Sequence, residues 1–383
     1  MTVRVGIVGF SEDKKIVLSN LLHQYAVTIT ESEETNVVIS ADNATDRKPQ
    51  IRISSVGVDT IPAVDDEQVI VLSSSLIETC SAKLEGILNP KISTSYKIIT
   101  GLPFQYNLVP SSIRSHLLKA RQFDTDLSRH LAIEIARKSI IDAFRSLGFP
   151  LERKVPPSLL VTHDIDTEKG FHNSLSLKAV DDEVGVSSLW FLPADEYPIS
   201  THIAGELARG SVIGSHDTKH DGKLVTMRRQ SALLARLKKS KTTLQNLFER
   251  EITHFRAPLL QFSRRIAIAL GEAGYTADFS VPCWEPIHPS TMNGSGIESA
   301  QPFRVENITE FPLTLFQDHQ LLNVMRLSTR EAVKFWTEQA RLIRKFDGDL
   351  VLSVHPDYAF SRDLESYREL LKSLLEVQAA DAA

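Results

Sequence analysis

The chain has 383 residues, a net charge of -5 and 42% hydrophobic residues, an ordinary globular composition. Its length exceeds what one ordinary core supports, so we expect two domains. Because nucleic-acid binding needs a basic face, the negative charge argues against nucleic acid as the main partner. The two cysteines, Cys80 and Cys283, form neither a disulfide framework nor a zinc knuckle and suit a reducing compartment.

The N-terminal apolar stretch is short, is interrupted by Arg4 and is followed by charged residues without a small-residue cleavage site. A secretory signal is therefore not expected. No run approaches 18 apolar residues, so no membrane span is expected either. We therefore predict a cytoplasmic protein.

The first hundred residues predict a small α/β domain of Rossmann-like or flavodoxin-like type, with strands separated by helix-length or loop-length segments. Strands are predicted at residues 3–9, 37–40, 51–54 and 69–72, and a helix at 14–25. Gly6 and Gly9 match part of a phosphate-binding turn, but the full G-x-G-x-x-G is absent. A packing or docking role is therefore favoured, with nucleotide binding as the alternative.

Residues 101–155 are predicted to be a helical connector between residues 1–100 and a second domain at 156–375. Its helix covers residues 130–147, with Gly148 at the expected C-cap and Pro150 just beyond.

In the second domain, strand-like runs alternate with helical segments, a pattern typical of a parallel sheet or barrel. Strands are predicted at residues 159–162, 187–192, 212–215, 253–256, 277–281 and 350–354, and helices at 227–237, 263–273 and 329–346. We predict a distorted (β/α) barrel whose chemistry lies where its strands end.

Two carboxylates, Asp164 and Asp166, follow the apolar run at residues 159–161. At the end of an extended strand, residues i and i+2 point the same way. Two such carboxylates repel unless a cation lies beside them. A pair of solvated loop acids is the alternative, and the apolar strand favours the cation site.

His216 and His220 are four residues apart and would share one face if the segment were helical. Neutral imidazoles at this spacing commonly bind zinc or a similar ion. Two surface histidines are the alternative, and the preceding predicted strand favours the metal site. Asp217 and Asp221 flank the pair and are either acceptors for the ring N–H groups or solvated.

Arg256 and His355 are the remaining candidates. Arg256 precedes Ala257-Pro258, and because proline disfavours a helical residue before it, the turn is extended. Arg256 is expected to pair with Asp164 and keep it ionised, and an ordinary structural ion pair is the alternative. His355 ends the apolar run at 350–354 and is either a proton donor or a structural histidine.

These segments, in this order, resemble the motifs of the polysaccharide deacetylase family, also called the NodB homology domain or carbohydrate esterase family 4. Residues 162–166 resemble its first motif in a D-x-D form, with His163 in place of the usual aromatic residue. Residues 216–220 resemble its second motif, with Asp217 where Ser or Thr is usual. Arg256 to Pro258 and His355 resemble later motifs. The resemblance covers residues 155–375 and implies a NodB-type barrel; we expect His163 to face the core.

The resemblance also implies a metal centre. Asp166, His216 and His220 would bind one divalent ion, zinc first, with cobalt or nickel as alternatives. Asp278 resembles part of a fourth motif and would line the substrate groove. Trp284 would wall that groove, with plain packing as its alternative.

The catalytic roles follow from the same resemblance. Asp164 would be the general base for a metal-activated water, and Arg256 would orient Asp164 and balance its charge. His355 would protonate the departing amine. The backbone N–H of Leu259 is a weaker candidate for the oxyanion hole.

The predicted function is a metal-dependent hydrolase that removes an N-acetyl or other N-acyl group from an amino sugar or glycan precursor. Its expected partner is an N-acylated carbohydrate or related small molecule. A sugar-binding groove would need aromatic side chains, and these make up only 7% of the chain. A cyclic amide or ureide is therefore kept as an alternative substrate. A catalytically silent metal-binding scaffold is a further alternative, which the joint presence of Asp164, Arg256 and His355 counts against. The oligomeric state is not predicted.

Overall fold

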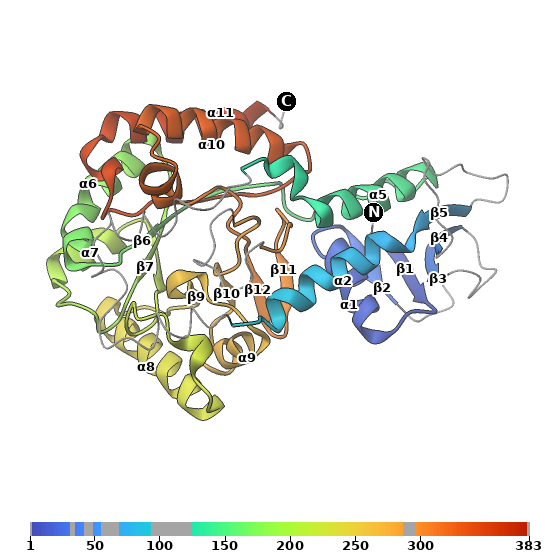
Figure 1. The fold of residues 1–383 in the computed structure, drawn as a ribbon, viewed down its shortest axis with the longest axis horizontal. Coiled ribbons are helices and arrows are strands. Elements are labelled where there is room, and N and C mark those ends of the chain that lie inside the picture. Colours follow the sequence, from blue (N-terminus) through green and yellow to red (C-terminus); the bar gives the residue numbers. More distant parts are fainter. Residues whose placement is uncertain are drawn as a thin grey trace.

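The computed structural model describes residues 2–30, 35–41, 49–54, 69–92, 125–285 and 296–380. In these ranges the chain forms a five-stranded sheet near its N-terminus and an eight-stranded sheet in its C-terminal part (Figure 1). No helix among the described residues is long and apolar enough to cross a membrane.

The N-terminal sheet is entirely parallel, in the order β2-β1-β3-β4-β5. Its strands are Val3–Val8 (β1), Val27–Ile29 (β2), Val37–Ala41 (β3), Gln50–Ser54 (β4) and Val69–Ser73 (β5). This is the flavodoxin-like strand order, so the predicted α/β class is confirmed. Strand β2 was not predicted because its three residues are partly or fully exposed and show no apolar run.

Three helices accompany this sheet: Glu12–Leu22 (α1), Ser74–Leu88 (α2) and Ala132–Ser146 (α5). Helix α2, which was not predicted, follows β5 directly, and the Ser73 side chain caps it by accepting the Ser75 N–H at 3.3 Å. Helix α5 ends one residue before the predicted end, with Leu147 as its C-cap, and Gly148 just beyond takes a φ of 84°, which favours glycine. It lies in the predicted connector but packs against α1 and α2. The predicted domain boundaries stay a prediction, and residues 101–124 of the connector lie outside the described residues.

The eight-stranded sheet has the order β11-β12-β10-β9-β8-β7-β6-β13 and is parallel except between β11 and β12. Its strands are Leu159–Asp164 (β6), Leu189–Leu192 (β7), Val212–Ser215 (β8), His254–Phe255 (β9), Ala277–Asp278 (β10), Phe303–Val305 (β11), Ile308–Glu310 (β12) and Leu350–Ser353 (β13). Among the described strands β11 and β13 are the two edges of the sheet and do not pair with each other, so the predicted distorted barrel is confirmed as an open one. Strands β11 and β12 were not predicted; each has three residues, one of them charged.

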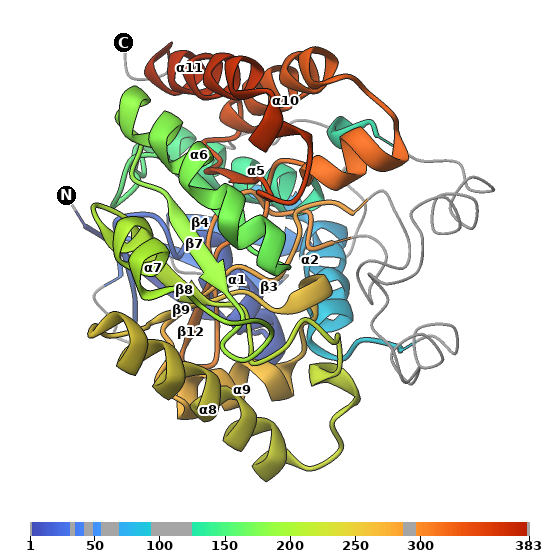
Figure 2. The same cartoon turned by 90° about the vertical axis from the view of Figure 1, so that its left-hand side faces the viewer.

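Helices cover the outside of this curled sheet, and Figure 2 shows α6, α7 and α8 beside β7 and β8. They are Glu168–Val184 (α6), Thr201–Ala208 (α7), Gln230–Phe248 (α8), Arg264–Glu272 (α9), Thr329–Arg344 (α10) and Leu364–Ala380 (α11). Helix α8 starts later and runs much longer than predicted. Helix α6 was not predicted because its buried face includes Lys178 and Asp181, which weaken the apolar period.

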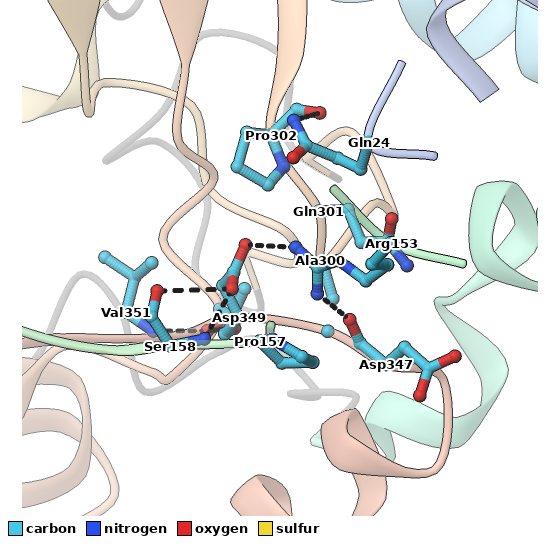
Figure 3. A network of polar contacts seen from close by, with 12 residues as sticks. Gln24, Arg153, Pro157, Ser158, Ala300, Gln301, Pro302, Asp347, Asp349 and Val351 are labelled. Atoms are coloured by element: carbon cyan, nitrogen blue, oxygen red, sulfur yellow. Dashed lines mark hydrogen bonds and ion pairs between the residues drawn. The ribbon is translucent and has the colours of Figure 1, made fainter. Parts of the chain in front are cut away.

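The two sheets share packing and hydrogen bonds. Apolar residues of the N-terminal part form one cluster with Phe262, Val281 and Phe303 of the barrel. Figure 3 shows a polar network at this junction, in which Asp349 accepts the Ser158 N–H at 2.7 Å and pairs with Arg153 at 3.2 Å. Asp349 immediately precedes β13, so this network fixes the strand that leads to the candidate site.

Candidate metal centre

Parallel strands bring the candidate residues to one edge of the barrel sheet. Asp164 ends β6, His216 follows β8, Arg256 follows β9 and His355 lies two residues after β13. Because β9, β8, β7, β6 and β13 are successive neighbours and parallel, their C-terminal ends lie together. The fold therefore assembles residues that are up to 191 positions apart in the sequence.

Asp166, His216 and His220 form a compact group whose candidate ligand atoms lie within 4.8 Å of one another. Asp166 Oδ1 is 3.4 Å from Nε2 of each histidine. His216 Nδ1 lies 2.8 Å from the Arg256 carbonyl oxygen, so Nδ1–H is the donor and the Nε2 lone pair faces Asp166. Asp166 Oδ1 is buried and accepts no hydrogen bond from the described residues. A buried carboxylate oxygen without a donor, facing two imidazole nitrogens, fits a divalent cation.

The charge states of this group also suit a cation. Burial raises the pKa of Asp166. The nearby histidines, His220 first and then His216 and His355, lower it by more, so the net shift is downward and the carboxylate is ionised. Burial lowers the pKa of His220, which favours the neutral imidazole that a metal requires.

The segment from His216 to His220 is a loop, so the two histidines do not lie on a helical face. Asp217 has a φ of 66°, a conformation that non-glycine residues rarely adopt. Arg236 of α8 holds this loop: its Nε donates to Asp217 Oδ1 at 2.9 Å and its Nη2 to Asp221 Oδ1 at 2.7 Å. Asp217 and Asp221 thus bind Arg236 rather than the histidine rings.

Arg256 and Asp164 lie together beneath the site. Arg256 Nη1 donates to Asp164 Oδ1 at 2.8 Å and to Thr162 Oγ1 at 2.7 Å, and the guanidinium lies 4.8 Å from the centre of the Phe191 ring. Burial raises the pKa of Asp164, but Arg256, His216 and His355 together lower it by more, so the net shift is downward. Asp164 is therefore an ionised, oriented carboxylate.

His355 is held by Asp318, a fully buried residue that the motif analysis missed. His355 Nδ1 lies 2.6 Å from Asp318 Oδ1, and His355 Nε2 lies 3.7 Å from Asp164 Oδ2. Burial lowers the pKa of His355, but Asp318, then Asp166 and Asp164, raise it to about 10. His355 is thus a protonated imidazole near neutral pH.

Three other predicted positions have distinct surroundings. Leu259 has φ 57° and ψ 25°, and Leu260 also has a positive φ, so the chain is strained just after Pro258. Trp284 is partly buried and stacks on His130 with an interplanar angle of 3°. The role of Trp284 in a substrate groove stays a prediction.

His163 faces the core as expected, because it is fully buried and stacks on Trp190.

The predicted groove role of Asp278 is wrong. The residue is fully buried, and its Oδ1 accepts hydrogen bonds from the Phe279 N–H at 2.9 Å and Ser280 Oγ at 2.6 Å. Across the parallel pair β10–β12 it lies opposite Glu310, which is also fully buried. Burial raises the pKa of Asp278 to about 6 and that of Glu310 well above its usual value. Asp278 is therefore part of a carboxyl pair inside the sheet and cannot contact a substrate.

No family model and no curated protein matches the chain. Among solved structures, it is similar to a protein from Mycobacterium smegmatis described as a polysaccharide deacetylase, at 18% identity and a TM-score of 0.47, over 60% of this chain and 86% of that one. It is also similar to a family 4 carbohydrate esterase from Streptomyces lividans at 13% identity and a TM-score of 0.36, over 58% and 90% of the two chains.

A carbohydrate esterase family 4 pseudoenzyme from Bacillus anthracis is similar at 12% identity and a TM-score of 0.39, over 58% of this chain and 62% of that one. All three similarities have identities below 25% and TM-scores below 0.5, so the function proposed for this chain rests on the residues of its own site.

Proposed function

We propose that the protein is a metal-dependent hydrolase that removes an N-acetyl or other N-acyl group from an amino sugar or glycan precursor. One observation carries this proposal: the group of Asp166, His216 and His220 lies beside a buried ionised carboxylate and a buried protonated histidine. Metal binding alone requires neither the Arg256–Asp164 pair nor the His355–Asp318 pair. Amide hydrolysis requires a base and an acid, which these two pairs supply.

Asp166, His216 and His220 would hold one divalent ion, zinc first and cobalt or nickel as alternatives. The bound ion would polarise the acyl carbonyl and lower the pKa of the attacking water. The rest of the chemistry falls to the side chains around it.

Asp164 would take the proton of the attacking water. Arg256 occupies its Oδ1, whereas Oδ2 accepts only a long hydrogen bond, at 3.4 Å, from Ser353 among the described residues. Asp164 Oδ2 is therefore the atom that would accept the proton of the attacking water. As the C–N bond breaks, the Nε2–H of His355 would protonate the leaving amine, while Asp318 keeps the imidazole oriented. The products are the carboxylic acid and the free amine.

The oxyanion that forms during attack needs a hydrogen-bond donor. The backbone N–H of Leu259 stays our candidate because the left-handed residues 259 and 260 follow the Arg256–Pro258 turn directly. Backbone strain of this kind persists where the surrounding structure maintains it, often at active sites.

The test is release of acetate and free amine from a panel of N-acetylated amino sugars, sugar nucleotides and short glycans by the zinc-loaded protein. Cyclic amides and ureides form a second panel. Turnover of a sugar that depends on added metal and on Asp164 supports the proposal. Turnover of ureides alone would favour the non-sugar alternative, and metal binding without any turnover would favour a silent scaffold.

A further inference from the structure

A strongly basic stretch follows the metal-site histidines. Between Asp221 and Glu249 the chain has no acidic residue but seven basic ones: Lys223, Arg228, Arg229, Arg236, Lys238, Lys239 and Lys241. The chain as a whole carries a net charge of -5, so positive charge is concentrated in this stretch.

Five of these residues are exposed, and we call the three that precede α8, Lys223, Arg228 and Arg229, the basic rim. None of the three forms an ion pair with any described residue, whereas Arg236 and Lys239 do. Nearby carboxylates have other partners. Asp221 binds Arg236, Asp195 binds Lys239, and Glu196 accepts the N–H of the metal-site residue His220.

The basic rim lies between His220 and the start of α8 at Gln230, on the sheet edge where the candidate residues gather. Its backbone is attached to the segment that follows Arg256. The Val225 N–H donates to Gln261 Oε1 at 3.1 Å, and Arg265 Nη2 donates to the Arg228 carbonyl at 2.9 Å. The rim therefore has a fixed backbone that joins two loops of the candidate centre.

Arg265 brings a third guanidinium group to the Arg228 backbone, and it forms no ion pair with an acidic residue in the part of the chain that the structure describes. Clustered like charges raise the local electrostatic potential, and binding of an anion relieves it. Adjacent arginines with a lysine suit the several oxygens of a phosphate, which accept paired N–H donors. We propose that the basic rim binds a phosphate or diphosphate group carried by the substrate. This inference rests on the proposed function and narrows its substrate to a phosphorylated N-acylated amino sugar.

The experiment measures anion binding separately from turnover. Inorganic pyrophosphate is titrated by calorimetry into the His216→Ala/His220→Ala protein, which lacks the histidines through which a metal would bind the probe. The same protein with Lys223→Gln, Arg228→Gln and Arg229→Gln is compared. A matched control carries Lys334→Gln, Arg341→Gln and Lys345→Gln, two exposed cations on α10 and one at its C-cap.

We expect the rim substitutions to weaken pyrophosphate binding by about tenfold or more, because they remove charge-assisted contacts, and the α10 control to leave it unchanged. The charge-preserving Arg228→Lys/Arg229→Lys protein should bind pyrophosphate more weakly than the parent but more tightly than the glutamine variant, because it keeps the charge and loses the paired N–H donors. Equal weakening in rim and control proteins, or no binding before the rim is changed, would overturn the proposal.

A second arm separates a soluble phosphate ester from a membrane surface. Co-sedimentation with phosphatidylglycerol vesicles is compared with phosphatidylcholine vesicles for the same proteins. Rim-dependent binding to anionic vesicles that pyrophosphate does not displace would overturn the proposal in favour of membrane docking. Because pyrophosphate binding is measured without turnover, a failure here is distinguishable from failure of the proposed hydrolase activity.

Discussion

Asp318 Oδ1 lies 2.6 Å from His355 Nδ1, and Asp318 Oδ2 accepts the backbone N–H of His355 at 2.7 Å. One carboxylate therefore fixes both the ring and the backbone of the candidate acid. Asp318 reaches this position because residues 311–318 bridge the open side of the barrel. In this segment the Leu313 N–H donates to the Val281 carbonyl and the Leu315 N–H to the Val351 carbonyl.

The Asp318→Asn substitution should narrow the pH range of activity. Asp318 is the main group that raises the pKa of His355 to about 10. His355 acts as the protonated form, so activity should fall as pH rises through its pKa. Without the carboxylate that pKa drops, and the alkaline limb of kcat/KM should move to lower pH. An unchanged alkaline limb would show that His355 is not the acid.

The same pair should contribute to stability in a defined pH window. His355 has a higher pKa in the folded protein than its usual 6.5, so its contribution is complete below about pH 6.5. It is lost as pH rises through about 10. Urea unfolding of wild type and His355→Gln between pH 6 and 10 should give a difference in unfolding free energy that shrinks with rising pH. A constant difference would contradict the shifted pKa.

Asp164→Asn should retain metal and lose turnover by about 10²–10⁴-fold, because it removes the base without touching the metal-site atoms. The His216→Ala/His220→Ala protein should instead lose the metal. Metal content by mass spectrometry and acetate release are measured on each protein. His202→Ala, an exposed histidine on α7, is the matched control and should change neither. Full activity of Asp164→Asn would rule out the base assignment.

Arg236→Ala should weaken metal binding by about 10–100-fold, as removal of groups that orient metal ligands does. Its guanidinium holds Asp217 in a left-handed conformation and binds Asp221 in a bidentate way. Arg236→Lys should recover little of the loss, because an ammonium group cannot make the planar fork. Competition with a zinc-chelating dye gives the affinity. Lys239→Ala on the same helix is the control. Equal losses of metal affinity in both proteins would argue against a specific role of Arg236 in holding the metal-site loop.

Sequence patterns located the barrel and most of the candidate centre because strand-like runs lead directly into the motif residues. Asp164, Asp166, His216, Arg256 and His355 all stand within two residues of such a strand. Contacts between distant segments left no comparable signal. Asp318 follows no predicted strand and meets His355 from 37 residues away. Arg236 lies inside a helix, where one arginine resembles any surface cation.

The Asp278–Glu310 pair gives a prediction about stability. Each carboxyl has one buried oxygen without a hydrogen-bond partner among the described residues, and the two residues are direct neighbours across β10 and β12. Because two adjacent buried carboxylates cannot both be ionised, they would share one proton. Glu310→Gln keeps a hydrogen-bond donor for Asp278 and should lower the free energy of unfolding by less than about 1 kcal/mol at neutral pH.

Glu310→Ala removes that donor and leaves a buried carboxylate unpaired. It should therefore lower the free energy of unfolding by about 3 kcal/mol or more. Urea unfolding of both variants measures the difference.

The pH dependence of stability gives a second check. Asp278 has a raised pKa in the folded protein, so its contribution to the free energy of unfolding is present below its usual pKa of 3.8 and is lost as pH rises through about 6. The Asp278→Asn protein lacks this titration and should lose less stability between pH 4 and 6 than wild type. Equal costs for Glu310→Gln and Glu310→Ala would mean that the two carboxyls do not share a proton.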